Sequence, residues 1–251
     1  MSSGVETSLI SRVRDSSASL GMTKAADKII VALDVATKEK ALDLVEELHD
    51  QISFFKIGLQ LYMAEGPAVV REVLKKDVKV FLDLKLHDIP NTVARAVESA
   101  AGLGAQMLTI HLSGGREMIR AAAEARKNNL SILGVTVLTS ATEETLQEIG
   151  ISDKIGNQVL RLAKLGVEAG IDGLVGSPHE IKMLRAQFGA KIKLVVPGIR
   201  PSWSETGDQR RVMTPRKALD AGANYLVIGR PIIADPNPRQ ALTKILDELE
   251  S

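Results

Sequence analysis

The chain has 251 residues, and its 45% hydrophobic and 25% charged residues are the balance of an ordinary globular protein. With 32 Lys and Arg against 31 Asp and Glu, the net charge of +1 gives no electrostatic argument for nucleic acid or an anionic membrane as a partner. The absence of cysteine excludes disulfides, thiolate zinc sites, iron–sulfur clusters and cysteine nucleophiles, and no segment has the apolar length needed to span a bilayer.

Residues 1–26 are rich in serine and show no hydrophobic periodicity, so we expect them to form a poorly ordered N-terminal tail. Their apolar pair Leu9-Ile10 is far too short for the core of a secretory signal, which makes a cytoplasmic location the expectation. A single folded domain is predicted over residues 27–251.

From residue 28 onward, short apolar runs alternate with amphipathic stretches. Nearly continuous apolar strands that alternate with helices are typical of a parallel sheet covered by helices. The predicted strands are residues 29–33, 54–57, 78–82, 106–110, 131–137, 173–175, 192–196 and 225–228. The predicted helices are residues 38–48, 92–101, 117–125, 155–169, 179–188 and 238–249.

Eight strand–helix units without a Gly- or Pro-rich linker favour one α/β domain, a closed (β/α)8 TIM barrel. An open, doubly wound sheet is the alternative. Its usual signal, G-x-G-x-x-G after the first strand, is missing, because the chain there reads Leu33-Asp34-Val35-Ala36. Both folds place functional residues at the carboxyl ends of the strands.

Ionisable residues stand at the carboxyl ends of the first three predicted strands. Asp34 ends the first, Lys56 lies near the end of the second, and Asp83 and Lys85 end the third. Strand alternation puts Phe81, Asp83 and Lys85 on one face, directed toward the barrel mouth. We therefore expect the four charges to converge on one pocket, where two carboxylates and two ammonium groups balance. The alternative is a structural ion-pair cluster that closes the barrel end.

Two histidines stand beside these charges, His111 at the end of the fourth strand and His87 just after the third. For His111 a hydrogen-bonded core histidine is the better interpretation, and for His87 a local structural role.

A phosphate site is predicted after strands seven and eight, where barrels of this kind often bind phosphate. Gly229 lets the backbone approach closely, Arg230 offers a bidentate fork, and a short helix starting there would point backbone N–H groups at the anion. The long polar loop after strand seven, which contains Arg200 and Gln209, resembles a lid. Its neighbouring Arg210 and Arg211 are interpreted as solvated.

Several segments together carry a specific family resemblance. The chain resembles the bacterial form of orotidine 5′-monophosphate decarboxylase over nearly the whole predicted domain. The D-x-K-x-x-D element at Asp83, Lys85 and Asp88 is shared with related sugar-phosphate lyases, whereas its continuation Ile89-Pro90-Asn91-Thr92 is much more specific. The other matching segments are residues 30–34, 55–58, 135–140, 197–201, 207–209 and 227–232.

The resemblance implies decarboxylation of orotidine 5′-monophosphate to uridine 5′-monophosphate, the last step of new pyrimidine nucleotide synthesis, with no metal and no organic cofactor. It implies that Lys85 protonates C6, that Asp83 stands beside the substrate carboxylate, and that Asp88 and Thr92 reach the neighbouring site of a homodimer. The remaining implied substrate contacts are Asp34 and Lys56 at the ribose, Thr139 at the pyrimidine, Arg200, Gln209, Gly229 and Arg230 at the phosphate, and Ile89 and Pro197.

Two other functions stay open at this point. One is a metal-dependent sugar-phosphate decarboxylase or aldolase of the same barrel group, which would use Asp83 to hold Mg²⁺. The other is a non-catalytic nucleotide-binding barrel, although such a protein has little reason to keep Lys85 between two carboxylates.

Overall fold

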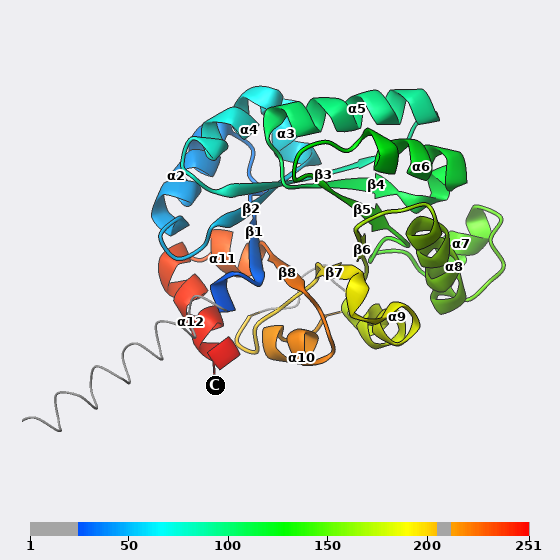
Figure 1. Ribbon diagram of the computed structural model, residues 1–251. Helices are drawn as coiled ribbons and strands as arrows, with labels where there is room; N and C mark the ends of the chain where they lie inside the picture. Colours follow the sequence, from blue (N-terminus) through cyan, green and yellow to red (C-terminus); the bar gives the residue numbers. More distant parts are fainter. Residues whose placement is uncertain (1–24, 205–211, 251) are drawn as a thin grey trace, which may run out of the picture.

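Eight parallel strands close into a barrel in the computed structural model, which describes residues 25–204 and 212–250 (Figure 1). Each strand pairs with the next along the chain, and β1 pairs with β8 to complete the ring. The strands are β1 (Ile29–Ala32), β2 (Phe54–Gly58), β3 (Lys79–Leu86), β4 (Met107–His111), β5 (Ser131–Val135), β6 (Gly173–Val175), β7 (Lys193–Val196) and β8 (Tyr225–Ile228). The predicted (β/α)8 barrel is confirmed.

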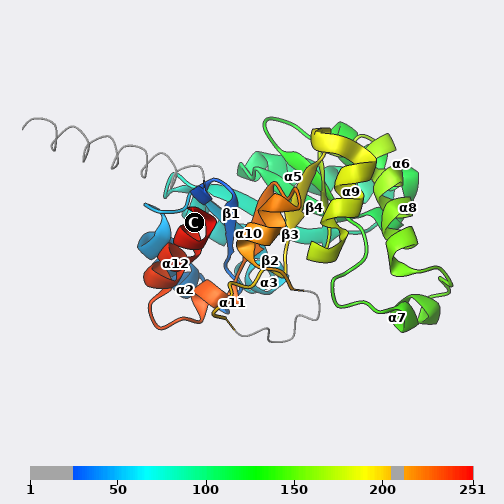
Figure 2. The ribbon, with the colours of Figure 1, turned by 90° about the horizontal axis from the view of Figure 1, so that it is seen from below.

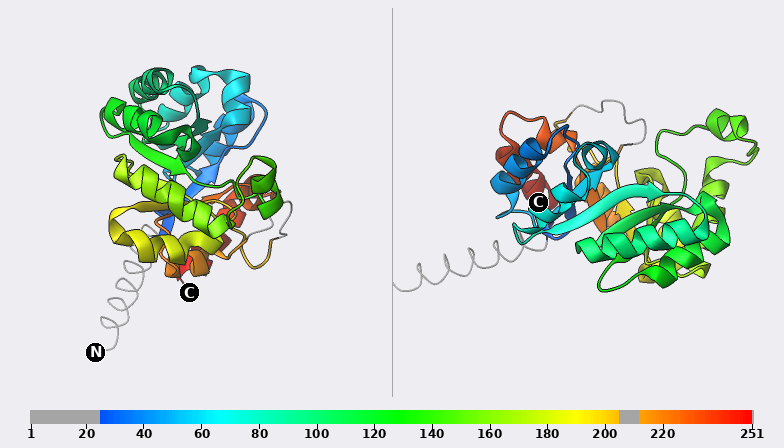
Figure 3. Two further views of the ribbon diagram at one scale, coloured as in Figure 1. Left: turned by 90° about the vertical axis from the view of Figure 1, so that its right-hand side faces the viewer. Right: turned by 90° about the horizontal axis from the view of Figure 1, so that it is seen from above.

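The helices lie around the outside of this ring (Figure 1). They are α2 (Lys38–Leu48), α3 (Leu59–Glu65), α4 (Pro67–Leu74), α5 (Pro90–Leu103), α6 (Gly115–Ala125), α7 (Glu143–Glu148), α8 (Ile155–Glu168), α9 (Ile181–Phe188), α10 (Pro215–Asp220), α11 (Arg230–Ile233) and α12 (Pro238–Glu250). Short 3-10 turns occupy Leu112–Gly114, Pro178–Glu180 and Gly189–Lys191. Figures 2 and 3 show α7 projecting beyond the ring of helices.

Local sequence signals explain where several helices begin and end. The Thr37 side chain accepts a hydrogen bond from the Lys40 N–H and caps α2. Helix α5 starts with Pro90, whose missing N–H is no loss in a first turn, and ends at Gly104 in the left-handed conformation with φ of 90°. The short helix expected after Gly229 is α11, whereas α3, α4, α7 and α10, which were not predicted from the sequence, have at most eight residues each. Such lengths are too short to show a clear helical period.

Alternation along the strands produces two separate apolar cores. Ile30, Phe54 and Phe81 belong to a small cluster inside the barrel, whereas Ile29 and Val31 belong to the larger cluster between strands and helices. The barrel interior is therefore filled by side chains, and space for a ligand lies only beyond them, at an end of the strands.

Ala25 and Ala26 are partly buried and pack against the larger core. The rest of the predicted N-terminal tail, residues 1–24, lies outside the described residues. Of the helices in the described part of the chain, none combines the length and the apolarity that crossing a membrane requires.

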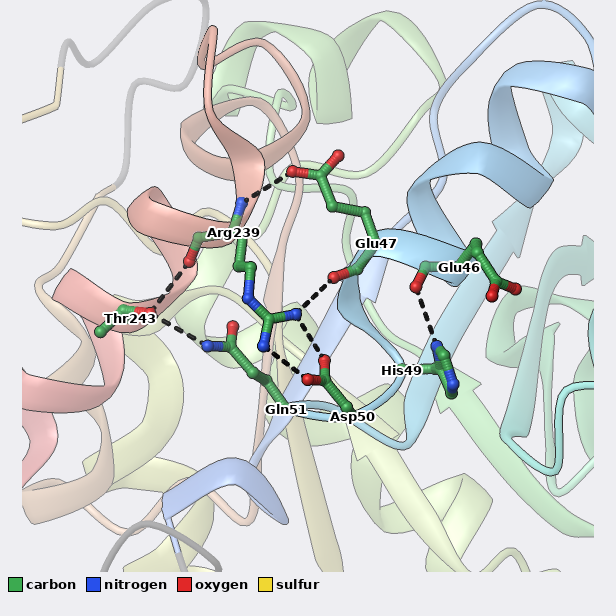
Figure 4. A network of polar contacts seen from close by, with 7 residues as sticks. All are labelled: Glu46, Glu47, His49, Asp50, Gln51, Arg239 and Thr243. Carbon is green, nitrogen blue, oxygen red and sulfur yellow. Dashed lines mark hydrogen bonds and ion pairs between the residues drawn. The ribbon is translucent and has the colours of Figure 1, made fainter.

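The first and last helices of the barrel are tied together by a polar network (Figure 4). The Arg239 guanidinium, on α12, donates to Asp50 Oδ1 at 2.7 Å and to the Glu47 carbonyl at 3.0 Å. Gln51 Nε2 donates to Thr243 Oγ1 at 3.1 Å. Beneath this surface layer, Leu242 and Ile245 of α12 are fully buried. Closure of the chain thus combines an exposed ionic layer with an apolar one.

The buried apolar side chains of α12 should contribute more to the free energy of unfolding than the exposed polar network between α2 and α12. Leu242→Ala removes a fully buried side chain, and we expect it to lower the free energy of unfolding by about 2–5 kcal/mol. Arg239→Ala breaks contacts that are exposed, and we expect a smaller loss that shrinks as salt is added. Urea denaturation at low and high salt measures both. A loss for Arg239→Ala as large as that for Leu242→Ala would contradict the expectation.

Candidate active site

A cavity of about 620 Å³ opens at the carboxyl ends of the strands. The barrel directs the last residues of many strands toward this one place, which is why distant parts of the sequence meet here. The lining residues are Ala32, Asp34, Lys56, Gln60, Phe81, Asp83, Lys85, Val135, Val137, Leu138, Thr139, Val175, Gly176, Pro197, Gly198, Arg200, Val227, Gly229 and Arg230.

Two aspartates and two lysines form an alternating row along one side of the cavity. Lys56 Nζ lies 2.9 Å from Asp34 Oδ1 and 3.7 Å from Asp83 Oδ2. Lys85 Nζ lies 2.8 Å from Asp83 Oδ1. The predicted convergence of the four charges is confirmed. Each charge is adjacent to one of opposite sign, which offsets the cost of removing them from water.

Asp83 is the most constrained member of this row. Burial by itself would raise the pKa of its carboxyl, but the attraction of Lys56 and Lys85, together with hydrogen bonds from Lys85 and Thr109, holds the pKa below its ordinary value. Asp83 is therefore an anion at neutral pH. Both of its carboxylate oxygens already face cationic or hydroxyl partners.

The backbone of β3 is irregular where the site is built. Leu82 pairs with Leu108 and Leu86 with Ile110, so the register shifts between these two pairs. Lys85 has a φ of 49°, a left-handed conformation that costs a non-glycine residue roughly 1–2 kcal/mol. The regular pleat through Lys85 that was predicted from strand alternation is therefore wrong. Asp83 and Lys85 nevertheless both line the cavity, as predicted.

Gly58, at the end of β2, leaves room for the ionic row. A Cβ atom at this position would lie 2.8 Å from Lys56 Nζ and 3.2 Å from Asp34 Oδ1. Real Cβ atoms do not come as close as 2.8 Å, so a side chain at this position would displace the Lys56 ammonium.

Two arginines bring positive charge to the part of the cavity formed by the ends of β7 and β8. Arg200 is buried, and its Nη1 donates to the Ile199 carbonyl at 2.9 Å. Arg230 begins α11 directly after Gly229. A second hollow of about 440 Å³ shares both arginines and is also lined by Trp203 and Ser204. The predicted phosphate residue Gln209, with Arg210 and Arg211, lies outside the described residues.

The rest of the cavity wall is mainly apolar. Thr139 and Pro197, both predicted, are half-buried in it. Sequence reasoning missed Gln60, which follows β2 without any distinguishing pattern. It also missed Thr109, which is fully buried behind Asp83. A lone hydroxyl inside the apolar strand Met107–His111 was the available signal for Thr109.

Three predicted site residues do not reach this cavity. Asp88, Ile89 and Thr92 are exposed, at the end of β3 and the start of α5, and none of them lines the cavity. The carboxylate of Asp88 accepts a hydrogen bond from the Ile89 N–H at 2.6 Å. Within one chain the site therefore contains Asp83 and Lys85 but not Asp88.

His87 and His111 lie side by side, with ring centroids 5.7 Å apart. Burial first, and then the neighbouring His87 and Lys85, lowers the pKa of His111. His111 is thus uncharged at neutral pH. It is half-buried, and the hydrogen-bonded core position expected for it stays a prediction.

Comparisons with known proteins agree with this geometry. The family described as orotidine 5′-phosphate decarboxylase / HUMPS matches residues 27–245. A protein named orotidine 5′-phosphate decarboxylase from Carboxydothermus hydrogenoformans is 49% identical over 232 residues, which is 90% of this chain and 97% of that protein. Its namesake from Psychromonas ingrahamii is 47% identical over 226 residues, 88% of this chain and 97% of that protein.

The likeness extends to solved structures. The crystal structure of orotidine 5′-phosphate decarboxylase from Lactobacillus acidophilus superposes with a TM-score of 0.80 at 34% identity, over 90% of this chain and 100% of that one. The sequence match, the closed barrel and the charged row at its mouth lead to one conclusion: the chain belongs to the orotidine 5′-phosphate decarboxylase / HUMPS family.

Proposed function

We propose that the cavity binds orotidine 5′-monophosphate and converts it to uridine 5′-monophosphate and carbon dioxide, the last step of new pyrimidine nucleotide synthesis. The observation that carries this proposal is the alternating row of Asp34, Lys56, Asp83 and Lys85, which lines the same cavity as Arg200 and Arg230. An anionic nucleotide spanning the cavity would place its phosphate at the arginines and its reacting ring at Lys85.

The reaction needs a cation beside the carbon that loses its carboxylate. When the C6–carboxylate bond breaks, the electron pair stays on C6 in the ring plane, and the proton of Lys85 then bonds to it. An ammonium about 4 Å away stabilises such a charge by on the order of 4 kcal/mol at an effective dielectric of about 20. Enzymes lower barriers by roughly 8–23 kcal/mol, so preorganisation and binding energy must supply the rest.

Asp83 contributes by repulsion in the bound ground state. Its carboxylate is ionised and held in place by Lys56 and Lys85. A substrate carboxylate beside it is destabilised, and the repulsion ends when neutral carbon dioxide leaves.

The far end of the substrate supplies the binding energy. We assign the phosphate to Arg200, Arg230 and Gln209, with Gly229 giving close backbone access. Asp34 and Lys56 contact the ribose. Thr139 and Pro197 complete the nucleotide site within the chain, whereas Ile89 lies outside the cavity of its own subunit, as Asp88 and Thr92 do. Contacts remote from C6 can be used to hold the ring against Asp83 and Lys85, so the phosphate affects the chemical rate as well as affinity.

We further propose that the enzyme works as a homodimer in which Asp88 and Thr92 complete the neighbouring subunit's site. Asp88 lies three residues beyond Lys85 in the chain and does not line the cavity of its own subunit. Two large apolar side chains that follow neighbouring strands are uncovered: Ile89, next to Asp88, is 67% exposed, and Met63 of α3 is 77% exposed. Contact with a second copy would account for such exposed apolar surface.

The chemistry needs no metal ion, because Lys85 supplies both the charge and the proton. The oxygens of Asp83 that a divalent cation would use are already next to Lys56, Lys85 and Thr109.

Loss of absorbance on adding orotidine 5′-monophosphate to chelator-treated protein tests the proposed reaction directly. Activity that disappears with the chelator would favour a metal-dependent enzyme instead.

Lys85→Ala should remove the proton donor and lower kcat by at least ~10²–10⁴-fold, while binding of uridine 5′-monophosphate stays measurable by calorimetry. Lys79→Ala is the matched control, because Lys79 is exposed at the opposite end of the same strand. Near-normal turnover by Lys85→Ala would contradict the assignment.

Arg230→Ala should weaken binding of uridine 5′-monophosphate by roughly 10–100-fold, the loss expected for a hydrogen-bonded charge pair, and leave binding of uridine nearly unchanged. Arg120→Ala, which breaks a surface pair with Glu124, serves as the control. If uridine weakens as much as its phosphate, Arg230 acts on the fold and not on the phosphate.

Mixing inactive Asp88→Ala and inactive Lys85→Ala proteins should restore about a quarter of wild-type activity, because half of the dimers are then hybrids with one intact site each. Asp83→Ala mixed with Lys85→Ala is the control, since both groups serve the same site and no hybrid gains an intact one. Absence of recovery after demonstrated subunit exchange would rule out a shared site.

A further inference from the structure

The register between β3 and β4 leaves one residue of β4 facing three residues of β3. Leu82 pairs with Leu108, and Leu86 pairs with Ile110. Asp83, Leu84 and Lys85 therefore all fall opposite the single residue Thr109. Regular main-chain pairing cannot continue through such a mismatch.

A side chain takes over where the main chain does not pair. The Lys85 N–H donates to Thr109 Oγ1 at 2.9 Å, and the Thr109 hydroxyl donates to Asp83 Oδ1 at 3.0 Å. A hydroxyl has one hydrogen and two lone pairs, so Thr109 can make both bonds at once. Lys85 Nζ reaches the same Asp83 oxygen at 2.8 Å. Lys85 is thus linked to Asp83 Oδ1 twice: from its backbone N–H through the Thr109 hydroxyl, and directly from its Nζ.

Thr109 has no direct access to a ligand. Its residue is 0% exposed, and it does not line the cavity. Its two partners, in contrast, are the residues assigned to the reacting carbon. Any influence of Thr109 on the reaction must therefore act through the backbone of Lys85 and the carboxylate of Asp83.

We propose that Thr109 is a positioning residue for decarboxylation, whose hydroxyl holds the left-handed backbone of Lys85 and the carboxylate of Asp83 in their reactive arrangement. This inference rests on the proposed function. Lys85 adopts its φ of 49° without the freedom of a glycine, so an external bond is needed to select that conformation over extended alternatives. Thr109 supplies that bond from the neighbouring strand.

The test compares Thr109→Val with Thr109→Ser. Valine keeps the shape of threonine and removes the hydroxyl, whereas serine keeps the hydroxyl. We expect Thr109→Val to lower kcat by roughly 10–100-fold, the scale of losses from a misplaced reacting group, with little change in KM or in affinity for uridine 5′-monophosphate. Thr109→Ser should retain most of the wild-type kcat.

Thr136→Val is the matched control for loss of a buried threonine hydroxyl. Thr136 follows β5, is 4% exposed, and bonds only weakly to the Val175 carbonyl, at 3.4 Å. Wild-type kcat in Thr109→Val would overturn the proposal. The proposal would also be overturned if both Thr109 variants lost kcat, nucleotide-binding sites and thermal stability to the same extent, because that pattern indicates a purely structural role.

A second readout does not depend on turnover. The Thr109 hydrogen bond is among the interactions that lower the pKa of Asp83, beside the charges of Lys56 and Lys85; the nearby His111 is uncharged at neutral pH. Removing the hydroxyl should raise this pKa. The carboxyl carbon resonance of Asp83 should therefore titrate at higher pH in Thr109→Val than in wild type or Thr109→Ser.

The two readouts separate the possible failures. Wild-type protein that leaves orotidine 5′-monophosphate unchanged contradicts the proposed function, and the Asp83 titration then still tests the positioning by Thr109. An Asp83 titration that is identical in Thr109→Val and wild type overturns the positioning, whatever the wild-type activity.

Discussion

Mutual compensation of charge across the ends of β1, β2 and β3 is the constraint on which the site depends. Asp83 is kept ionised against its burial by Lys56 and Lys85, and Lys56 in turn contacts a second carboxylate, Asp34. Removing any one member leaves a neighbour with unbalanced charge in a poorly solvated place. The row therefore acts as a unit, and the effects of single substitutions within it are not expected to add.

The barrel makes this row possible because the side chains that pack its core and the charged side chains of the cavity occupy different places. Ile30, Phe54 and Phe81 fill the interior below the cavity, and the helices cover the outside. Among the non-glycine residues of the eight strands, Lys85 alone has a left-handed backbone, and it lies where β3 leaves the regular pleat. The surrounding sheet can hold such a conformation, because the other strand pairs of the barrel keep a constant register.

The periodicity of the sequence was sufficient to predict the eight strands, the long helices and the meeting of the charges. These features depend on local patterns and on the rule that strand ends meet. The role of Thr109 and the conformation of Lys85 could not be predicted, because both arise from a register shift between two strands, and register is a property of the assembled sheet. The position of Asp88 outside its own cavity likewise depends on where the chain turns after β3.

Because β1 pairs with β8, the cavity can be complete only after the last strand has been synthesised. Gly229 directly follows β8, the last strand to be synthesised, yet it lies next to the end of the first strand: a Cβ at Gly229 would lie 3.4 Å from Ala32 Cβ and 3.5 Å from Asp34 Oδ2. The nucleotide site is thus assembled from both ends of the domain. A chain that ends after seven strands contains Asp34, Lys56, Asp83 and Lys85 but lacks Gly229 and Arg230, so under the proposed function it could not gain stability from binding the phosphate of its substrate there.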